Sequence, residues 1–490
     1  QSVQAGLRNA TVAFTSPIFI AFILVVVLLT QALPSPAGRS GVLLLASLVF
    51  IGSHVDSIGQ VGPLAAFLLL CYVAIEGVRR SRTAASLWMG GVAVIASFVV
   101  LKKFSFLDES LLLPFPYLVI GLSYVLFRVL HLMIDAKQGE LIERIAPLHF
   151  VNYTCNFLSF IAGPVQRYGD YTLQQGRALA LDEETVFQAF ARLIKGFVKV
   201  GVVSAIFNYL FSSMSGRLLD PALAPALPLM CGLFVAAAVF YAVYLYANFS
   251  GYMDIVIGVG TLMGQELPEN FNRPFTARSF LDFWSRWHMT LSDWFRTYVF
   301  NPLMKTLTSR FTSPQAGPYL GVLAFFVTFL IMGVWHGTTS VFVVYGLLMG
   351  TGASINKLWQ VFMTKRLGKK GYKALSERTA SIYLCRGLTV AYFALALTCL
   401  WVDMRELSWL AGRLGFVGIA ACYLGLALAA AAAFFAWDAL MLPLGPIARV
   451  MTQRSGGVIV RNLSLASQIL LIVTVASFFH KAPEFVYRAF

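Results

Sequence analysis

Two histidines are candidate catalytic groups, because each follows a tryptophan in an apolar or aromatic setting. His336 follows Trp335 at the end of an uncharged apolar stretch, and His288 follows Trp287 within the polar and aromatic stretch 282–296. Ionisable side chains at membrane depth are costly and usually face an interior cavity. A neutral imidazole is also the natural general base near neutral pH. The two histidines therefore indicate proton-transfer chemistry inside an apolar protein.

Each histidine also has a structural interpretation, which the residues alone leave open. His336 is equally compatible with a hydrogen-bonded packing role near a membrane interface. The region around His288 is too polar for lipid and too aromatic for open water, so it fits an interfacial or cavity-lining helix. A histidine on such a helix can simply belong to its surface belt. There, Asp282 and Arg286 are i,i+4 neighbours that can pair, and Trp284 shares a stripe with His288.

A run of polar residues lies between two apolar runs in the middle of the chain. Its amide, hydroxyl and carboxylate groups belong to Asn248, Ser250 and Asp254. We expect them either to line a channel or to hold a kinked helix by satisfying its backbone groups. Gly333 and Gly337 are also informative, because small residues let another helix or a ligand approach the backbone closely.

A loop and a helix are expected directly after this polar run. The segment 268–274 contains two prolines and three turn-prone polar residues, so it cannot be the interior of a helix. Ser279, with Asp282 three residues later, is a plausible helix N-cap. We predict one helix from there to about Tyr298, which would carry the first of the two histidines.

The elements that must position these groups are membrane-spanning helices. The chain has 490 residues, of which 58% are hydrophobic and 12% are charged, whereas a soluble domain carries about 25% charged residues. By the requirement of about 20 apolar residues per span, we count roughly ten to twelve spans. We predict an all-α polytopic integral membrane protein with interfacial or re-entrant helices around a central channel, and a single membrane-embedded domain over residues 1–490. Three of the expected spans are uncharged, at 229–247, 320–336 and 414–437.

The net charge of +15 fits the same picture. Lys and Arg of membrane proteins gather in cytoplasmic loops beside anionic lipid, so we expect membrane lipid and no nucleic acid as a partner. Arg79, Arg80 and Arg82 lie between two apolar runs, which predicts a cytoplasmic loop and an extracytoplasmic N-terminus; Lys102 and Lys103 do not fit this orientation. The six cysteines form no close pair and the six histidines show no ligand spacing, so we expect neither disulfides nor a metal site.

The order and spacing of several segments resemble the membrane-bound O-acyltransferase family. These segments are 248–254, 268–274, 282–296 and 333–337. The stretch 162–168 looks like the Ala-Gly-Pro-Ile-x-Arg-Tyr segment of its bacterial branch, which includes alginate O-acetyltransferases and the D-alanyl-transfer proteins of teichoic acid modification. The resemblance covers about residues 121–350. Residues 300–305 differ from the corresponding stretch of alginate-type members, because they lack its pair of glycines.

The resemblance implies transfer of an acetyl or D-alanyl group from a cytoplasmic thioester to hydroxyls of an extracytoplasmic cell-envelope polysaccharide or other polymer. It implies the bacterial inner membrane, acetyl-CoA or an acyl-carrier protein as donor, no tightly bound cofactor, and an SGNH-type extracytoplasmic acyltransferase as partner. His336 would be the general base, and His288 would bind or orient a substrate. The channel and substrate-binding residues would be Asn248, Ser250, Asp254, Trp284, Trp287 and Trp335.

The C-terminal tail, residues 480–490, has two interpretations. Phe485-Val486-Tyr487 resembles an aromatic motif at the end of members of this branch or of their small partner peptides. The resemblance implies that the Tyr487 hydroxyl accepts the acyl group and passes it to a periplasmic partner, which requires an extracytoplasmic C-terminus. Alternatively, the tail is an aromatic anchor at the membrane edge.

Two other functions remain open from the residues. One is a transporter or polymer-export channel that uses the histidines as a proton relay. That function predicts intramembrane carboxylates and repeat symmetry, and the sequence contains little of either. The other is an acyltransferase that acts on lipid.

Overall fold

Helices make up most of the chain, because apolar segments inside a membrane can satisfy their backbone polar groups by helical hydrogen bonds. The computed structural model describes residues 16–175, 181–220, 222–223, 225–313, 315–441 and 457–478. Among these residues the β pairing is a single isolated bridge between Phe271 and Trp287. The predicted all-α polytopic fold is thus confirmed.

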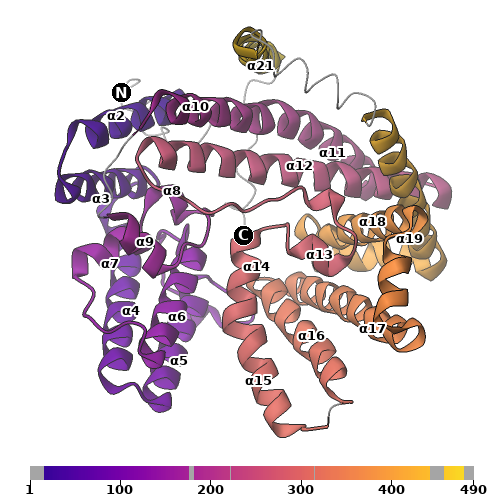
Figure 1. Cartoon of the computed structure of the whole chain (residues 1–490), viewed down its shortest axis with the longest axis horizontal. Coiled ribbons are helices and arrows are strands. Elements are labelled where there is room, and N and C mark those ends of the chain that lie inside the picture. The colour runs from indigo at the N-terminus through magenta and orange to yellow at the C-terminus, as the bar shows by residue number, and fades with distance from the viewer. Residues whose placement is uncertain are drawn as a thin grey trace. The chain divides into compact units, whose positions relative to one another are not determined.

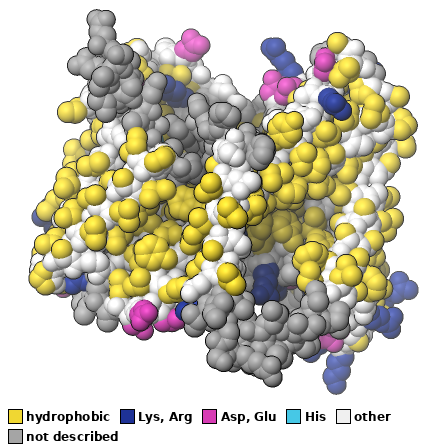
Figure 2. Space-filling model, turned by 90° about the horizontal axis from the view of Figure 1, so that it is seen from above, with side chains coloured by type: hydrophobic (Ala, Val, Ile, Leu, Met, Phe, Trp, Pro, Cys, Tyr) yellow, Lys and Arg dark blue, Asp and Glu magenta, His cyan; other side chains and the backbone are white. Residues whose placement is uncertain are grey.

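Within the part of the chain that the structure describes, seven helical segments are long and apolar enough to cross a bilayer. Their helices are α4 (Gly62–Ser81), α5 (Ala84–Leu101), α12 (Leu227–Leu262), α16 (Gly317–Trp335), α17 (Val341–Ser376), α18 (Thr379–Ala396) and α19 (Met404–Met441). Three shorter apolar helices occur in α2 (Pro17–Ala32), α3 (Pro36–Gly52) and α21 (Gly457–Phe478). Hydrophobic side chains cover much of the face seen in Figure 2, and charged side chains are sparse there.

The chain divides into two compact units. The first unit comprises the residues up to Phe197 together with Gly251–Glu269, and the second comprises Val198–Ser250 and the residues from Asn270 onward, up to Pro483. One of the points at which the chain passes from one unit to the other, between Ser250 and Gly251, falls inside α12, which is one continuous helix.

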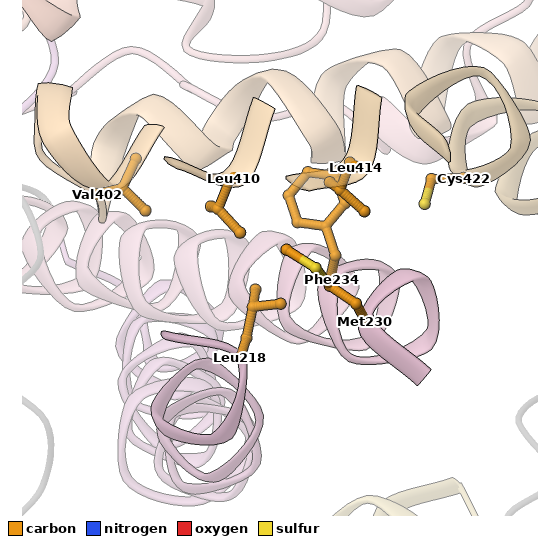
Figure 3. Close-up of a cluster of buried hydrophobic side chains, with 7 residues drawn as sticks. All are labelled: Leu218, Met230, Phe234, Val402, Leu410, Leu414 and Cys422. Atoms are coloured by element: carbon orange, nitrogen blue, oxygen red, sulfur yellow. The ribbon is translucent and has the colours of Figure 1, made fainter. Parts of the chain in front are cut away.

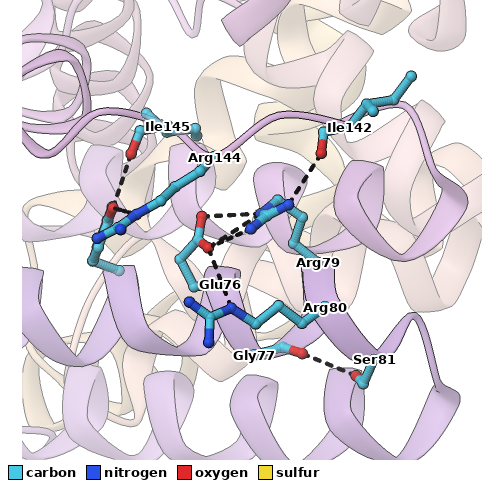
Figure 4. A network of polar contacts seen from close by, with 9 residues as sticks. Glu76, Gly77, Arg79, Arg80, Ser81, Ile142, Arg144 and Ile145 are labelled. Atoms are coloured by element: carbon cyan, nitrogen blue, oxygen red, sulfur yellow. Dashed lines mark hydrogen bonds and ion pairs between the residues drawn. The ribbon is translucent and has the colours of Figure 1, made fainter.

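The first unit contains α4, α5 and α6 (Leu122–Gln138), which lie side by side (Figure 1). The shorter helices α7 (Pro147–Thr154), α8 (Phe157–Phe160), α9 (Tyr168–Gln175) and α10 (Glu183–Val198) also belong to it, apart from the last residue of α10. A polar network at the end of α4 holds the loop after α6 (Figure 4). Arg79 binds Glu76 at 2.8 Å and donates to the Ile142 carbonyl oxygen at 3.0 Å, while the Tyr72 hydroxyl donates to the Ile145 carbonyl oxygen.

A buried arginine organises the irregular segment between α7 and α9. Arg128 on α6 is 1% exposed and donates to the carbonyl oxygens of Tyr153, Thr154 and Ser159 at 2.7 to 2.9 Å. The last carbonyl groups of a helix lie beyond the reach of its own amides, and buried backbone groups without partners are costly. The segment 162–168, quoted above for its family resemblance, follows directly.

The second unit contains α16, α17, α18 and α19, with α11 (Ala205–Leu219) and the first part of α12. Glycines bring α16 and α17 together: a Cβ on Gly333 would overlap the Gly346 Cα, and one on Gly350 would lie 2.9 Å from the Phe326 carbonyl oxygen. Side chains of α11, α12 and α19, with one from the turn before α19, form a buried cluster (Figure 3). Its members are Leu218, Met230, Phe234, Val402, Leu410, Leu414 and Cys422.

Candidate active site

The chain leaves the helical conformation at His288. The helix α13 (Phe280–Trp284) ends before it, and α14 (Met289–Phe295) begins after it. His288 itself has a left-handed backbone, with φ 45° and ψ 54°. The prediction of one helix from Asp282 to about Tyr298 is therefore wrong, and Trp284 does not share a helical stripe with His288. A non-glycine residue in this conformation costs about 1–3 kcal/mol and persists only where its surroundings hold it.

The surroundings that hold His288 come from the proline-flanked loop. The Asn272 amide donates to the Arg286 carbonyl oxygen, and the Met289 amide donates to the Asn270 carbonyl oxygen, both at 2.9 Å. These bonds flank the bridge described above and run the loop antiparallel to residues 286–289. The backbone there bonds to the loop instead of to its own helix, which explains the break.

Asn270 is a functional candidate that the sequence analysis missed. Its side chain is fully buried, and Oδ1 accepts hydrogen bonds from the backbone amide of Thr290 at 3.1 Å and from its hydroxyl at 2.7 Å. The same oxygen lies 3.4 Å from Nδ1 of His288. The segment 268–274 indicated only a loop, and no spacing rule connects it with a histidine 18 residues later.

The His288 ring is buried in the second unit. It is 1% exposed, and its ring meets the Phe249 ring edge-on at 4.8 Å between centroids. Burial lowers the pKa of His288 well below its usual value of about 6.5, and a positive charge on His336 lowers it further. The structure therefore brings the two imidazoles within electrostatic range of one another, and His288 is neutral at pH 7.

His336 directly follows the last residue of α16. It is 5% exposed, and its ring lies 4.8 Å from Trp335 and 5.6 Å from Tyr345 on α17. Gly337 packs against Phe342, so a Cβ there would overlap that ring. Close packing of α17 thus surrounds His336 with aromatic side chains.

Two of the predicted tryptophans, Trp284 and Trp287, pack among aromatic side chains of the second unit. Trp287 stacks on Phe283 with 5.5 Å between ring centroids and 17° between planes, and it meets Phe393 of α18 at 4.9 Å. Trp284 meets Phe329 of α16 edge-on at 5.2 Å. Trp284 and Trp287 are therefore buried within a cluster of aromatic rings, and their side chains are 5% and 2% exposed.

The start of α13, just before these tryptophans, is capped as predicted. The Asp282 amide donates to the Ser279 hydroxyl at 3.1 Å, and Arg286 Nε pairs with Asp282 Oδ1 at 2.8 Å. The second Asp282 oxygen accepts from the Arg278 amide at 2.8 Å. Asp282 and Arg286 therefore stabilise the entry to α13.

The polar run of α12 is distributed over both units. Asn248 is fully buried in the second unit, where its Nδ2 donates to the Ser204 hydroxyl at 3.3 Å. Ser250 is also buried in that unit. Asp254, in the first unit, pairs with Arg192 Nε at 3.1 Å, and Arg192 Nη2 binds Glu269 at 2.6 Å. The three polar residues lie within one helix and not at a break between two.

Two further predictions concern groups outside this arrangement. Within the described ranges, no three or more His, Cys, Asp or Glu side chains gather in a geometry that could hold a metal ion. All six cysteines are free. Tyr487 and the tail 480–490 lie outside the residues that the structure describes.

Known proteins are similar to this chain in the region that contains the two histidines. The model of the membrane-bound O-acyltransferase family matches residues 49–396, which include both histidines. The teichoic acid D-alanyltransferase of Bacillus subtilis is 32% identical over 233 residues, covering 46% of this chain and 56% of that protein. The probable alginate O-acetylase AlgI of Pseudomonas fluorescens is 29% identical over 355 residues, covering 70% of this chain and 66% of that protein. The chain thus spans less than two thirds of the length of these relatives.

Proposed function

The chain belongs to the membrane-bound O-acyltransferase family, and we propose that it transfers an acyl group from a thioester donor to a hydroxyl group. The observation that carries this proposal is the pair of buried histidines, His288 and His336, which influence one another electrostatically and each pack against aromatic rings of the second unit. A hydroxyl is a poor nucleophile until a base takes its proton during attack, and a buried neutral imidazole suits that task.

In the proposed reaction His336 is the general base. It takes the proton of the acceptor hydroxyl while the hydroxyl oxygen attacks the carbonyl carbon of the thioester. A carbon–oxygen bond forms, the carbon–sulfur bond breaks, and the proton passes from the imidazolium to the departing sulfur. General-base assistance contributes about 10²- to 10⁴-fold, so positioning of both substrates in a dry site must supply much of the remaining acceleration.

His288 is proposed to orient a substrate and not to share the proton. A positive charge on His336 opposes a positive charge on His288. The His288 imidazole therefore stays neutral while His336 carries the proton. A neutral ring can still hydrogen-bond to a substrate oxygen or sulfur. Trp287 and Trp284 would exclude water from one side of the reacting groups, since their neighbours are aromatic rings.

The acyl group and the acceptor are proposed from the relatives. Their names refer to D-alanylation of teichoic acid and to O-acetylation of alginate. For this chain we therefore propose an acetyl or D-alanyl group and an extracytoplasmic cell-envelope polymer. Acetyl-CoA or an acyl-carrier protein would supply the group from the cytoplasm, and an SGNH-type extracytoplasmic acyltransferase would complete the transfer.

The proposed location is the bacterial inner membrane. Exposed cations gather near the end of α17 and support a cytoplasmic position for that end, because short cytoplasmic loops are enriched in Lys and Arg. They are Lys365, Arg366, Lys369, Lys370 and Lys373. Both chain termini are proposed to be extracytoplasmic, and single-cysteine labelling from each side of sealed vesicles tests this orientation.

The test of the function is transfer of mass from a defined donor. The purified protein in nanodiscs is incubated with acetyl-CoA or a D-alanyl carrier protein, and envelope polymers from cells with and without the chain are compared by mass spectrometry. The proposal predicts thioester consumption and an added acetyl or D-alanyl mass, both of which disappear in His336→Ala. If neither the consumption nor the added mass depends on the chain, the proposal is wrong.

A further inference from the structure

The side-chain oxygen of Asn270 contacts Nδ1 of His288, and this contact has no role in the reaction proposed above. Asn270 lies in the loop that forces His288 out of the helix, and it binds the chain on the far side of the histidine. Its carbonyl oxygen accepts from the Met289 amide at 2.9 Å, and its side-chain oxygen accepts twice from Thr290. The buried Asn270 therefore hydrogen-bonds to both residues that follow His288, Met289 and Thr290.

These bonds identify the atoms of the Asn270 amide. The Thr290 backbone amide can only donate, so the Asn270 atom that it meets at 3.1 Å must be the oxygen. The oxygen and nitrogen of an asparagine are otherwise assigned by their hydrogen-bond network. Here the network leaves one choice, because exchanging the two atoms would place an NH₂ group against an N–H donor.

The same oxygen then selects the tautomer of His288. An amide oxygen only accepts hydrogen bonds, so Nδ1 of His288, 3.4 Å away, must carry the proton to bond with it. In a neutral imidazole the other nitrogen, Nε2, then holds the lone pair. The contact is long, and hydrogen bonds of catalytic groups often tighten only when substrate is bound.

We propose that Asn270 is a positioning residue for His288: its side-chain oxygen keeps the imidazole protonated at Nδ1 and, through Thr290, holds the left-handed backbone that presents the ring. In this tautomer Nε2 is the unprotonated nitrogen and the hydrogen-bond acceptor of the ring. The consequence for catalysis rests on the proposed function, whereas the tautomer of His288 does not depend on it.

The direct test is the tautomer itself. Nitrogen NMR of the whole protein, labelled with ¹⁵N-histidine in nanodiscs, distinguishes protonation at Nδ1 from protonation at Nε2. The His288 signals are assigned by their loss in His288→Gln. We expect Nδ1 protonation in the wild-type protein, and in Asn270→Ala a shift of the population towards the Nε2-protonated form. A wild-type protein protonated at Nε2, or an unchanged tautomer in Asn270→Ala, would overturn the proposal.

Two matched variants separate this role from folding. Asn270→Asp keeps an oxygen acceptor in place, so Nδ1 should stay protonated even if stability falls. Thr290→Val removes one of the three donors and leaves the Asn270 contact to the ring, so the tautomer should also be unchanged. If Asn270→Asp shifts the tautomer as Asn270→Ala does, the oxygen acceptor is not the cause and the proposal is wrong.

Kinetics then test whether the contact matters for turnover. Loss of the hydrogen-bond partner that orients a metal-ligating histidine typically costs about 10- to 100-fold, and we take the same range for a partner that orients His288. We expect Asn270→Ala to lower kcat by that factor in the wild-type protein, but by less than about 3-fold in a His288→Ala background, because the two residues act as a unit. An equal loss in both backgrounds contradicts action through His288. Absence of turnover in the wild-type protein contradicts the proposed function and leaves the NMR result standing.

Discussion

His288 and His336 oppose one another's protonation, since a positive charge on His336 lowers the pKa of His288 below the value that burial alone sets. Two imidazoles in one apolar site would otherwise both be candidates for the base. A proton on one ring therefore disfavours a proton on the other, which makes a division of labour physically reasonable. In the proposed reaction His336 is the base that takes the proton of the acceptor hydroxyl. His288 stays neutral and orients a substrate.

His336→Ala should abolish acyl transfer while the protein still inserts and purifies as a monodisperse species. We expect a loss of at least 100-fold, because general-base assistance contributes about 10²- to 10⁴-fold. The rate of thioester consumption in nanodiscs measures it. His149→Ala is the matched control, because His149 is exposed on α7 of the first unit and should keep full activity. More than about 10% residual activity in His336→Ala contradicts the general-base role.

Acidification should destabilise the protein partly through His288. Its folded-state pKa lies below its unfolded value, so the unfolded state binds more protons once the pH falls below about 6.5. Each pH unit below that point costs at most about 1.4 kcal/mol from this residue. The measurement is the melting temperature between pH 8 and pH 5. We expect His288→Gln to flatten the fall in melting temperature towards acid; the same slope in both proteins would refute the pKa direction.

Arg192→Met should destabilise the first unit, because Arg192 binds Asp254 and Glu269 together. Removing one partner of a buried ion pair costs about 3–5 kcal/mol, and partial exposure of the Arg192 side chain reduces that figure. The melting temperature in nanodiscs reports the loss. Glu269→Gln is the control in the same network, and it should cost less since the Glu269 side chain is 54% exposed. If Arg192→Met and Glu269→Gln lower the melting temperature equally, the ion pair between Arg192 and the buried Asp254 is not the more important one.

Gly333→Ala should disturb the contact between α16 and α17, because the added Cβ would overlap the backbone of Gly346. Overpacking typically costs about 1–3 kcal/mol, and His336 lies only three residues further on, so activity should fall as well. Gly321→Ala on the same helix is the control, since its Cβ would meet only Lys357 at 3.7 Å. Melting temperature and turnover are compared for both, and equal behaviour of the two variants would contradict the packing argument.

Tyr487→Phe tests the proposed acyl relay of the C-terminal tail. The substitution keeps the ring and removes the oxygen, so it should stop acylation of the polymer if that oxygen carries the group. A phenol is more acidic than a sugar hydroxyl, and its acyl ester is a better donor onward. Phe485→Leu alters the tail and keeps the hydroxyl, so it should retain activity. Polymer acylation at the wild-type rate in Tyr487→Phe would leave the tail as an anchor only.

Features that depend on residues close in the chain were predictable. The apolar runs predicted membrane-spanning helices because a span is defined by length and composition alone. The Ser279 cap and the Asp282–Arg286 pair followed from spacings of three and four residues, and the structure contains both. The two tryptophan–histidine pairs contributed to the resemblance to the membrane-bound O-acyltransferase family, and the match over residues 49–396 confirms that family.

Features that depend on distant residues became visible only in the tertiary structure. The local pattern favours a helix through His288, but the Asn270 carbonyl oxygen accepts from the Met289 amide and the Asn272 amide donates to the Arg286 carbonyl oxygen, and these bonds replace helical ones. Asp254 is paired with Arg192, 62 residues away, and no spacing rule connects them. Helix propensity and capping act over a few residues. A loop that returns to the helix, or an ion pair between distant helices, is decided by which segments the packed fold brings into contact.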